Sequence, residues 1–331
     1  MKTVGVKRSY GKQRWNGGDG LAEKRVLVVT GPTATGKTAL GVELALALDG
    51  EVVSADSMQI YRGFDIGTAK AMPEEMRGVP HHLLDVADPS EDWSVARWVD
   101  AAAECAEALF ERGKTPVIVG GTGLYIDSLL SGRDFSAVGE PALREELGAE
   151  YDRMGGEAFR EALRRVDPER AEKLHPADKK RLVRAMEVYR ATGEPLSVHD
   201  ARTRARPKRW PSLRIALSYA ERSALYARID ARVDEMFRAG LVEEVRGLLR
   251  SGVDPGGTAM QAIGYKEVAA HLLGEYSESE AAGAVCRASR RYAKRQFTWL
   301  RRDTHLHWFL WDAAPDVPGA AEAICALWRG A

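Results

Sequence analysis

The chain has 331 residues, enough to bury a sizeable core in one large domain or in two. Hydrophobic residues make up 45% of it and charged residues 29%, which is an ordinary soluble composition. The 48 lysines and arginines balance the 48 aspartates and glutamates, so the bulk charge predicts no polyanionic partner. Any surface for nucleic acid must come from local patches. No apolar run reaches about 18 residues, so no membrane-spanning helix is expected.

The cysteines and the first residues bear on location. Cys105, Cys286 and Cys325 are odd in number and far apart, so they form neither a metal-binding spacing nor a disulfide framework. This favours a reducing compartment, and we expect a cytoplasmic protein. Residues 1–24 are basic and lack the apolar segment of a secretory signal, so they are interpreted as a flexible tail.

The first predicted unit is a strand, a loop and a helix. RVLVVT at 25–30 is typical of a buried parallel strand, and ALGVELALAL at 39–48 has helical spacing. Between them GPTATGKT, at 31–38, matches G-x-x-x-x-G-K-[ST] at every fixed position. The glycines let backbone N–H groups turn inward, Lys37 adds charge for the outer phosphates, and the Thr38 hydroxyl is a candidate Mg²⁺ ligand. The motif predicts a phosphate-binding loop without saying whose phosphates it holds.

A second strand, EVVSAD at 51–56, places Asp56 beside that loop. Ligands bind at the carboxyl ends of parallel strands, so this carboxylate should project toward the phosphates. It could bind magnesium through water or accept a proton as a general base. Equally, an aspartate at this position could be the N-cap of a helix. The cluster that follows at 65–70, with Gly67 and Lys70, is weak evidence for a ligand on its own.

The third strand, TPVIVGG at 115–121, ends unusually. It follows a helical stretch, ARWVDAAAECAEALFERG, and runs into GGTGLY at 120–125. A nucleotide-hydrolysing P-loop protein often has an acid here, to hold magnesium. The two glycines and Thr122 instead favour a close approach of the backbone to a ligand, which argues mildly against plain ATP hydrolysis.

The alternation of strands and helices predicts the fold class. We expect an α/β protein with a P-loop NTPase-like parallel sheet core, formed by residues 25–130 and 205–331. Residues 131–204 are rich in Ala, Glu, Arg and Leu and predict an inserted all-helical domain. One more strand is expected at 213–219, and only helices from residue 221 onward.

Three basic stretches stand out in a chain of zero net charge. They are KKRLVR at 179–184, RTRARPKR at 202–209 and RASRRYAKRQFTWLRR at 287–302. Cations interleaved with aromatic residues suit a surface that follows a nucleic-acid backbone. For any single stretch, a solvated amphipathic helix remains the more common explanation.

Taken together, these segments resemble the tRNA dimethylallyltransferase (tRNA isopentenyltransferase) family over roughly residues 25–310. The resemblance rests on GPTATGKT, DSMQIYRGFDIGTAK, HHLLDVADPSEDWS, VGGTGLYIDSLLSG, LHPADKKRLVRAMEVYRATG, IGYKE and RRYAKRQFTWLRR. The chain has Thr35 where the family often has serine, and Gly123 where a larger residue is common.

The resemblance implies what the loop holds. In this family it binds dimethylallyl diphosphate, and the dimethylallyl group moves to N6 of adenosine 37, next to the anticodon of tRNA. Diphosphate leaves and Mg²⁺ is required. The implied partners are the donor and the anticodon stem-loop of tRNA, which the helical insertion would clamp. No membrane is involved, and we expect a monomer.

The resemblance also implies roles for individual residues. The catalytic group would be Asp56 as base, with Thr33 and Arg228 acting on the leaving diphosphate. The diphosphate would be bound by Gly31, Pro32, Thr33, Ala34, Thr35, Gly36, Lys37 and Thr38, and the metal by Thr38. The residues that face tRNA would be Asp56, Ser57, Met58, Gln59, Thr122, Arg144, Lys180, Arg181, Arg184, Gln261, Gly264 and Lys266.

Three other functions compete with this one. A prenyltransferase acting on free adenine nucleotides would share the loop and Asp56, but it would not need the insertion or the basic stretches. A small-molecule kinase would consume ATP and leaves DSMQIY and AKRQFTWLR unexplained. A tRNA-binding module without activity is disfavoured by the intact Lys37, Thr38 and Asp56.

Overall fold

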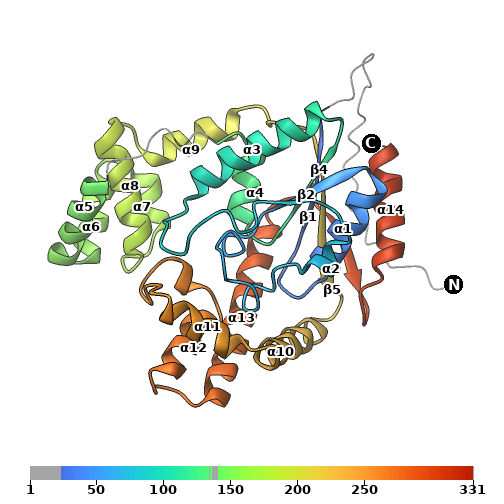
Figure 1. The fold of residues 1–331 in the computed structure, drawn as a ribbon. Helices are drawn as coiled ribbons and strands as arrows, with labels where there is room; N and C mark the ends of the chain where they lie inside the picture. The colour runs from blue at the N-terminus through green and yellow to red at the C-terminus, as the bar shows by residue number, and fades with distance from the viewer. Residues whose placement is uncertain (1–23, 134, 136–140, 331) are drawn as a thin grey trace. The chain divides into compact units, whose positions relative to one another are not determined.

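The computed structural model describes residues 24–133, 135 and 141–330 (Figure 1). The basic tail predicted at 1–24 therefore lies almost entirely outside the described residues. The chain divides into two compact units. Unit 1 is Met1–Asp127 with Trp210–Ala331, and unit 2 is Ser128–Arg209. The insertion predicted at 131–204 falls within unit 2.

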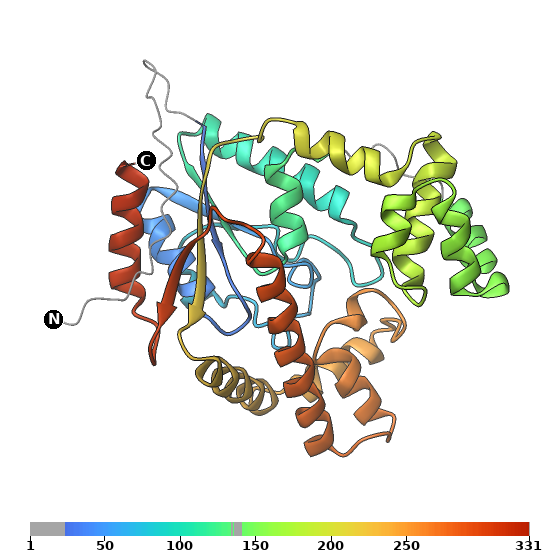
Figure 2. The ribbon, with the colours of Figure 1, turned by 180° about the vertical axis from the view of Figure 1, so that it is seen from behind.

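Unit 1 is built on a six-stranded sheet in which every described pair of neighbouring strands is parallel. The strand order is β3-β2-β4-β1-β5-β6, so β1 is central and β6 lies at an edge beside β5 (Figure 2). The strands are β1 (Val26–Thr30), β2 (Gly50–Ser54), β3 (His81–His82), β4 (Thr115–Val119), β5 (Ser212–Tyr219) and β6 (His307–Trp311).

Both faces of this sheet are covered, which explains why its central strands are apolar throughout. Leu27 and Val29 belong to the core that includes side chains of α1 (Lys37–Ala47) and α14 (Val317–Gly330), and these two helices lie side by side (Figure 1). Successive strand residues point to opposite faces, so Val28 points away from that core. The helix α3 (Val95–Glu111) packs on β2 and β4, where the Trp98 indole donates a hydrogen bond to the Ser54 carbonyl over 3.1 Å.

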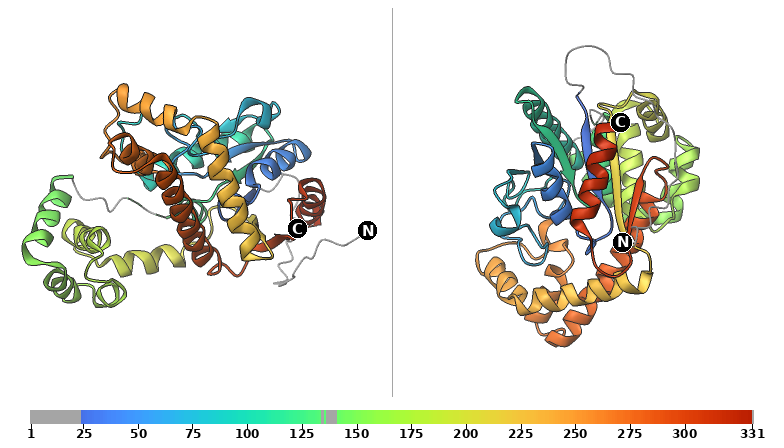
Figure 3. Two further views of the ribbon diagram at one scale, coloured as in Figure 1. Left: turned by 90° about the horizontal axis from the view of Figure 1, so that it is seen from below. Right: turned by 90° about the vertical axis from the view of Figure 1, so that its right-hand side faces the viewer.

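The remaining helices of unit 1 follow β5 or connect the strands. α10 and α13 run side by side (Figure 3). The long helix α13 begins with a capping box, in which Ser277 and Glu280 each accept a backbone N–H of the other. These elements are α2 (Pro73–Met76), α10 (Arg222–Arg238), α11 (Leu241–Arg250), a 3₁₀ turn η1 (Ala259–Gln261), α12 (Tyr265–Leu272) and α13 (Glu278–Leu300). The helix α4 (Gly123–Leu130) crosses from unit 1 into unit 2.

Unit 2 is helical throughout its described part and has its own small core. Leu147, Phe159, Leu163 and Leu182 are among the residues that fill it. Asp167 is buried and caps α7 (Pro168–Lys173) by accepting from Arg170 N, while its second oxygen accepts from Ser197 N over 2.9 Å and ties α7 to α9 (Leu196–Ala205). The helices are α5 (Pro141–Met154), α6 (Gly156–Arg164), α7 (Pro168–Lys173), α8 (Lys179–Thr192) and α9 (Leu196–Ala205).

The predicted α/β class and all four predicted strands are confirmed, with boundaries that differ by one or two residues. The expectation of helices alone after residue 221 is wrong, because β6 extends the sheet beside β5. Its five residues, HWFLW, form an apolar and aromatic run as long as β1, so a strand signal was present, but it lies between two helical stretches and has no strand next to it in the sequence. Within the described residues, no helix is long and apolar enough to cross a bilayer.

Candidate active site

The phosphate loop connects β1 to α1 and has a tightly fixed backbone. Gly31 has φ 145° and Gly36 has φ 82°. A Cβ atom at Gly31 would lie 2.4 Å from the Leu217 carbonyl oxygen, so only glycine fits there. The Thr35 carbonyl accepts a hydrogen bond from the Trp311 indole over 2.9 Å. The phosphate loop is therefore packed against β5 and hydrogen-bonded to β6, two strands that come much later in the chain.

The side chains at the end of the loop face a cavity. Lys37 Nζ donates to the Pro32 carbonyl over 2.7 Å, and no carboxylate of the described residues forms an ion pair with it. Burial, together with the charge of Arg232, lowers the pKa of Lys37 to about 7, although Asp56 opposes this shift. A bound anion would favour the protonated form of Lys37, so this side chain is suited to bind an anion. The Thr38 hydroxyl lines the same cavity.

Asp56 follows β2 and forms a tight turn. Its Oδ1 accepts from Met58 N over 2.9 Å, and the next amide, Ser57 N, donates to Thr122 Oγ1 over 3.1 Å. No helix of the described chain begins until Pro73–Met76, so the helix N-cap alternative for Asp56 is wrong. The side chain caps a turn instead and leaves one carboxylate oxygen for the cavity.

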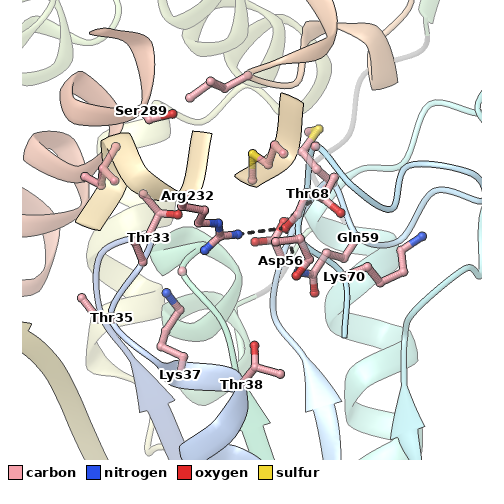
Figure 4. A pocket seen from close by; sticks show the side chains of 18 of the residues that line it. Thr33, Thr35, Lys37, Thr38, Asp56, Gln59, Thr68, Lys70, Arg232 and Ser289 are labelled. Atoms are coloured by element: carbon pink, nitrogen blue, oxygen red, sulfur yellow. Dashed lines mark hydrogen bonds between the residues drawn. The ribbon is translucent and has the colours of Figure 1, made fainter. Parts of the chain in front are cut away.

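An arginine from α10 completes this group of charges. Arg232 lies between Lys37 and Asp56, and its Nη2 donates to the Thr68 carbonyl over 3.4 Å (Figure 4). Burial is the main cause that lowers the pKa of Arg232, and Asp56 counteracts it. Arg228, the arginine singled out in the sequence, also lines the cavity, but it is paired with Glu235 at 3.1 Å. Sequence reasoning missed Arg232.

These groups line one cavity of about 1190 Å³ at the carboxyl ends of the strands in unit 1. The end of β4 forms part of its wall through Gly120 and Gly121. A Cβ at Gly120 would lie 2.2 Å from the Ala55 carbonyl oxygen, so the two strand ends touch through their backbones. The cavity can thus hold a phosphorylated ligand between the phosphate loop and Asp56.

The sequence left open whether the cluster at 65–70 contacts a ligand. In the structure, Lys70 of this cluster stabilises the loop itself. Lys70 Nζ is enclosed by the Tyr61 carbonyl at 2.9 Å, Asp65 at 2.5 Å and Asp85 at 2.6 Å. Its side chain points away from Lys37 (Figure 4). The ammonium has its partners within the protein and is not available to a phosphate.

The amide of Gln59 is likewise engaged within its own loop. Its Nε2 donates to the Thr68 and Ala69 carbonyls over 3.2 and 3.3 Å. Gln59 and Met58 still line the cavity, as does Ser57. Their predicted role toward an adenine base stays a prediction.

The residues at 261–266 that were predicted to face tRNA include one with a structural role and two that are accessible to a ligand. Gln261 is exposed and lines the cavity. Gly264 is buried with φ 101° and serves as the N-cap of α12, where its N–H donates to Glu267 over 2.8 Å. Lys266 is half exposed and lies 3.8 Å from Glu267. Gly264 has a structural reason to be glycine, whereas Gln261 and Lys266 are free to meet a ligand.

In unit 2, two of the predicted tRNA contacts are committed to a buried carboxylate. Glu187 has 0% exposure and accepts from Arg144 Nη2 at 3.0 Å and from Arg184 Nη1 at 2.9 Å. Arg181 is exposed and pairs with Asp178 at 3.2 Å. Lys180 is exposed and has no ion pair within the described part of the chain. Lys180 and Arg181 are therefore the better candidates for an external anion.

Gly123 has a local structural reason to be glycine. A Cβ at Gly123 would lie 2.4 Å from the Trp299 ring, whose indole nitrogen donates to Asp127 over 2.7 Å. The glycine makes room for this indole.

A parallel sheet with a glycine-rich loop after its central strand, and a carboxylate after the neighbouring strand, defines a P-loop protein with a site for a phosphorylated ligand. Comparison with known proteins is more specific. The "IPP transferase" family matches residues 59–303, and the "Isopentenyl transferase" family matches residues 24–91. The chain belongs to the IPP transferase family.

Individual relatives agree with this assignment. A tRNA dimethylallyltransferase of Desulforudis audaxviator (strain MP104C) is 47% identical over 299 residues, which is 90% of this chain and 96% of the relative. The crystal structure of the tRNA isopentenylpyrophosphate transferase of Bacillus halodurans is similar with a TM-score of 0.69 and 38% identity, covering 93% of this chain and 98% of that one. A eukaryotic dimethylallyltransferase acting on tRNA is similar with a TM-score of 0.80 and 28% identity, covering 93% and 79%.

Proposed function

We propose that this protein transfers the dimethylallyl group of dimethylallyl diphosphate to N6 of adenosine 37 in tRNA and releases diphosphate. The observation that carries the proposal is the convergence of Lys37, Arg232 and Asp56 on one cavity (Figure 4). Two cations beside a phosphate loop suit a diphosphate leaving group. A carboxylate facing them suits a base for the acceptor.

In this proposal the N6 amine of adenine attacks the first carbon of the donor, and the carbon–oxygen bond to diphosphate breaks. The proton that the amine loses goes to Asp56, whose turn is fixed by the bonds to Met58 N and between Ser57 N and Thr122. The negative charge that develops on the diphosphate is stabilised by Lys37, by the loop N–H groups and by Arg232. We assign this last role to Arg232, because Arg228 is already paired with Glu235.

The end of β4 supports transfer rather than hydrolysis of a nucleotide. Gly120 and Gly121 stand where a nucleotide-hydrolysing protein often has a magnesium-binding acid. A reaction in which carbon is attacked needs no water activated beside a terminal phosphate. This is the feature that favours a prenyl donor over ATP in this cavity.

Magnesium fits the site as part of a donor complex. Among the described residues, no group of three or more His, Cys, Asp or Glu side chains is arranged to hold a metal. Mg²⁺ commonly takes only one or two protein oxygens and completes its shell with phosphates and water. The Thr38 hydroxyl, which makes no hydrogen bond in the described chain, offers such an oxygen. Bound there with the donor, Mg²⁺ would neutralise charge on the diphosphate.

Exposed cations supply the proposed contacts to RNA phosphates. We assign these contacts to Lys180 and Arg181 of unit 2 and to Lys266 of unit 1. The proposal includes a monomeric enzyme that works in the cytoplasm, where tRNA is modified. Light scattering of the purified protein would test the monomer.

One experiment separates the proposal from its competitors. The protein would be incubated with Mg²⁺ and labelled dimethylallyl diphosphate, with unmodified tRNA in one arm and with AMP, ADP or ATP in the others. Label in tRNA alone supports the proposal. Label in a free nucleotide supports the small-molecule prenyltransferase instead, and turnover of ATP with no prenyl transfer supports a kinase.

A further inference from the structure

A single side-chain amide connects two loops of the active site. Gln296 lies on α13 and is only 7% exposed. Its Oε1 accepts from Thr33 N, in the phosphate loop, over 3.0 Å. Its Nε2 donates to the Gly121 carbonyl, after β4, over 3.0 Å. Both ends of one amide are thus used, each by the backbone of a different loop.

The contact is close and selective. A Cβ at Gly121 would lie 2.3 Å from Gln296 Nε2, so the amide is seated where only glycine permits it. The pairing needs an acceptor and a donor on the same side chain, which glutamine supplies. Glutamate would turn a second acceptor toward a carbonyl, and methionine would leave the part-buried N–H of Thr33 and the buried C=O of Gly121 without this partner.

The connection continues toward the base through the chain itself. Gly121 directly precedes Thr122, whose Oγ1 accepts from Ser57 N, the amide next to Asp56. The Tyr292 side chain, on α13 with Gln296, lies near Gln296 and Thr122, and burial raises its pKa to about 12. Hydrogen bonds and one peptide link therefore join the phosphate loop to the turn that carries Asp56.

We propose that Gln296 is a positioning residue of the transfer reaction, which fixes the phosphate loop relative to the Asp56 turn through Thr33 on one side and through Gly121 and its neighbour Thr122 on the other. The proposal rests on the function proposed above, because the loop holds the donor and Asp56 serves the acceptor. In-line transfer needs both to be held within a fraction of an ångström. Gln296 itself contacts neither reacting atom, so its effect should be on the chemical step more than on either binding step.

The test uses Gln296→Met, which keeps the length of the side chain and removes both hydrogen bonds. We expect the single-turnover rate at saturating donor and tRNA to fall by about 10²-fold, the loss typical of misplacement by about 1 Å. The dissociation constants for tRNA and for Mg²⁺ with inorganic diphosphate should change by less than about threefold, because the residues that bind them are still present. Gln296→Glu should lose a similar amount in rate, since it restores only the bond to Thr33 N.

The matched control is Thr115→Val. It removes one side-chain hydrogen bond, to the Leu48 carbonyl at 3.0 Å, from the opposite end of β4. Its melting temperature measures what such a change does to stability alone, and its transfer rate should equal that of the wild type.

Two outcomes would overturn the proposal. One is a Gln296→Met protein with a lowered melting temperature and an unchanged rate per folded molecule. The other is a loss found entirely in diphosphate affinity, which would make Gln296 part of the binding site. A wild-type protein that transfers no dimethylallyl group would instead reject the proposed function, so the two failures are distinct.

Discussion

Replacement of Arg232 by glutamine should impair transfer far more than the same change at Arg228. Both arginines are on α10, one turn apart, and both line the cavity. Arg232 is desolvated beside Lys37 and Asp56. Arg228 and its partner Glu235 are each 48% exposed. The two substitutions therefore form a matched pair in the same helix that differs mainly in the surroundings of the guanidinium.

The expected magnitudes follow from those surroundings. A desolvated donor aimed at a charge that grows in the transition state is typically worth about 2.7–4 kcal/mol, or about 10²–10³-fold in rate. An exposed ion pair contributes about 0–1 kcal/mol, so Arg228→Gln should change the rate by less than about fivefold. Arg232→Lys should recover part of the loss, because it restores the charge without the planar donors.

The assay is single-turnover transfer of labelled dimethylallyl groups to tRNA at several donor concentrations. For Arg232→Gln we expect a lower rate at saturating donor, with tRNA binding unchanged. A loss for Arg228→Gln that equals or exceeds the loss for Arg232→Gln would refute this reasoning. It would return the diphosphate role to the arginine chosen from the sequence.

Three further predictions concern the base, the loop lysine and the RNA surface. Asp56→Asn should lower the single-turnover rate by about 10²–10⁴-fold while tRNA binding persists, and a decrease below about tenfold would exclude Asp56 as the base. Because the pKa of Lys37 is about 7 in the free protein, diphosphate binding should take up a proton above that pH, so its affinity should fall as the pH rises beyond 7 and stay level below it. Calorimetry in buffers of different ionisation enthalpy would detect that uptake, and Lys37→Arg should abolish it. Replacing Lys180 and Arg181 by alanine should weaken tRNA binding and flatten its salt dependence by roughly 0.7 for each RNA phosphate that is no longer neutralised, whereas Lys173→Ala, an exposed control in unit 2, should leave the slope unchanged.

The phosphate loop and Asp56 could be predicted because their signals are local. A strand, a glycine-rich loop and a helix occur within about 25 consecutive residues, and each fixed position has one physical function. The parallel sheet followed from the alternation of strands and helices. The strand β6 was missed because four helices and a 3₁₀ turn separate it from β5, and only the pairing with β5 places it in the sheet.

Residues that depend on distant partners were less accessible to sequence reasoning. Arg228 and Arg232 lie four positions apart on one helix, so periodicity alone cannot tell which of them is enclosed. Arg184 and Glu187 are three positions apart on one helix, so their pairing could be expected from the sequence, whereas the burial of Glu187 and its second partner Arg144, 43 positions earlier, could not. Gln296 bonds to an amide 263 positions earlier in the chain, and nothing near it in the sequence indicates that contact.

The two ion pairs with a buried carboxylate change how the RNA surface should be tested. Removing Arg144 or Arg184 would leave Glu187 buried with less compensation, which is strongly destabilising. Weak tRNA binding in such a variant would report on the fold of unit 2. Lys180 and Arg181 avoid this ambiguity, because neither bonds to a buried carboxylate.

The most direct test of the central claim is to map the modified nucleotide. Unmodified tRNA transcripts with adenosine at position 37 would be incubated with the protein, Mg²⁺ and dimethylallyl diphosphate, then digested and analysed by mass spectrometry. We predict a single dimethylallyl group on the fragment that contains adenosine 37, and none when that adenosine is replaced by guanosine. Modification elsewhere, equal modification of the guanosine transcript, or no modification of tRNA by an active preparation would contradict the account.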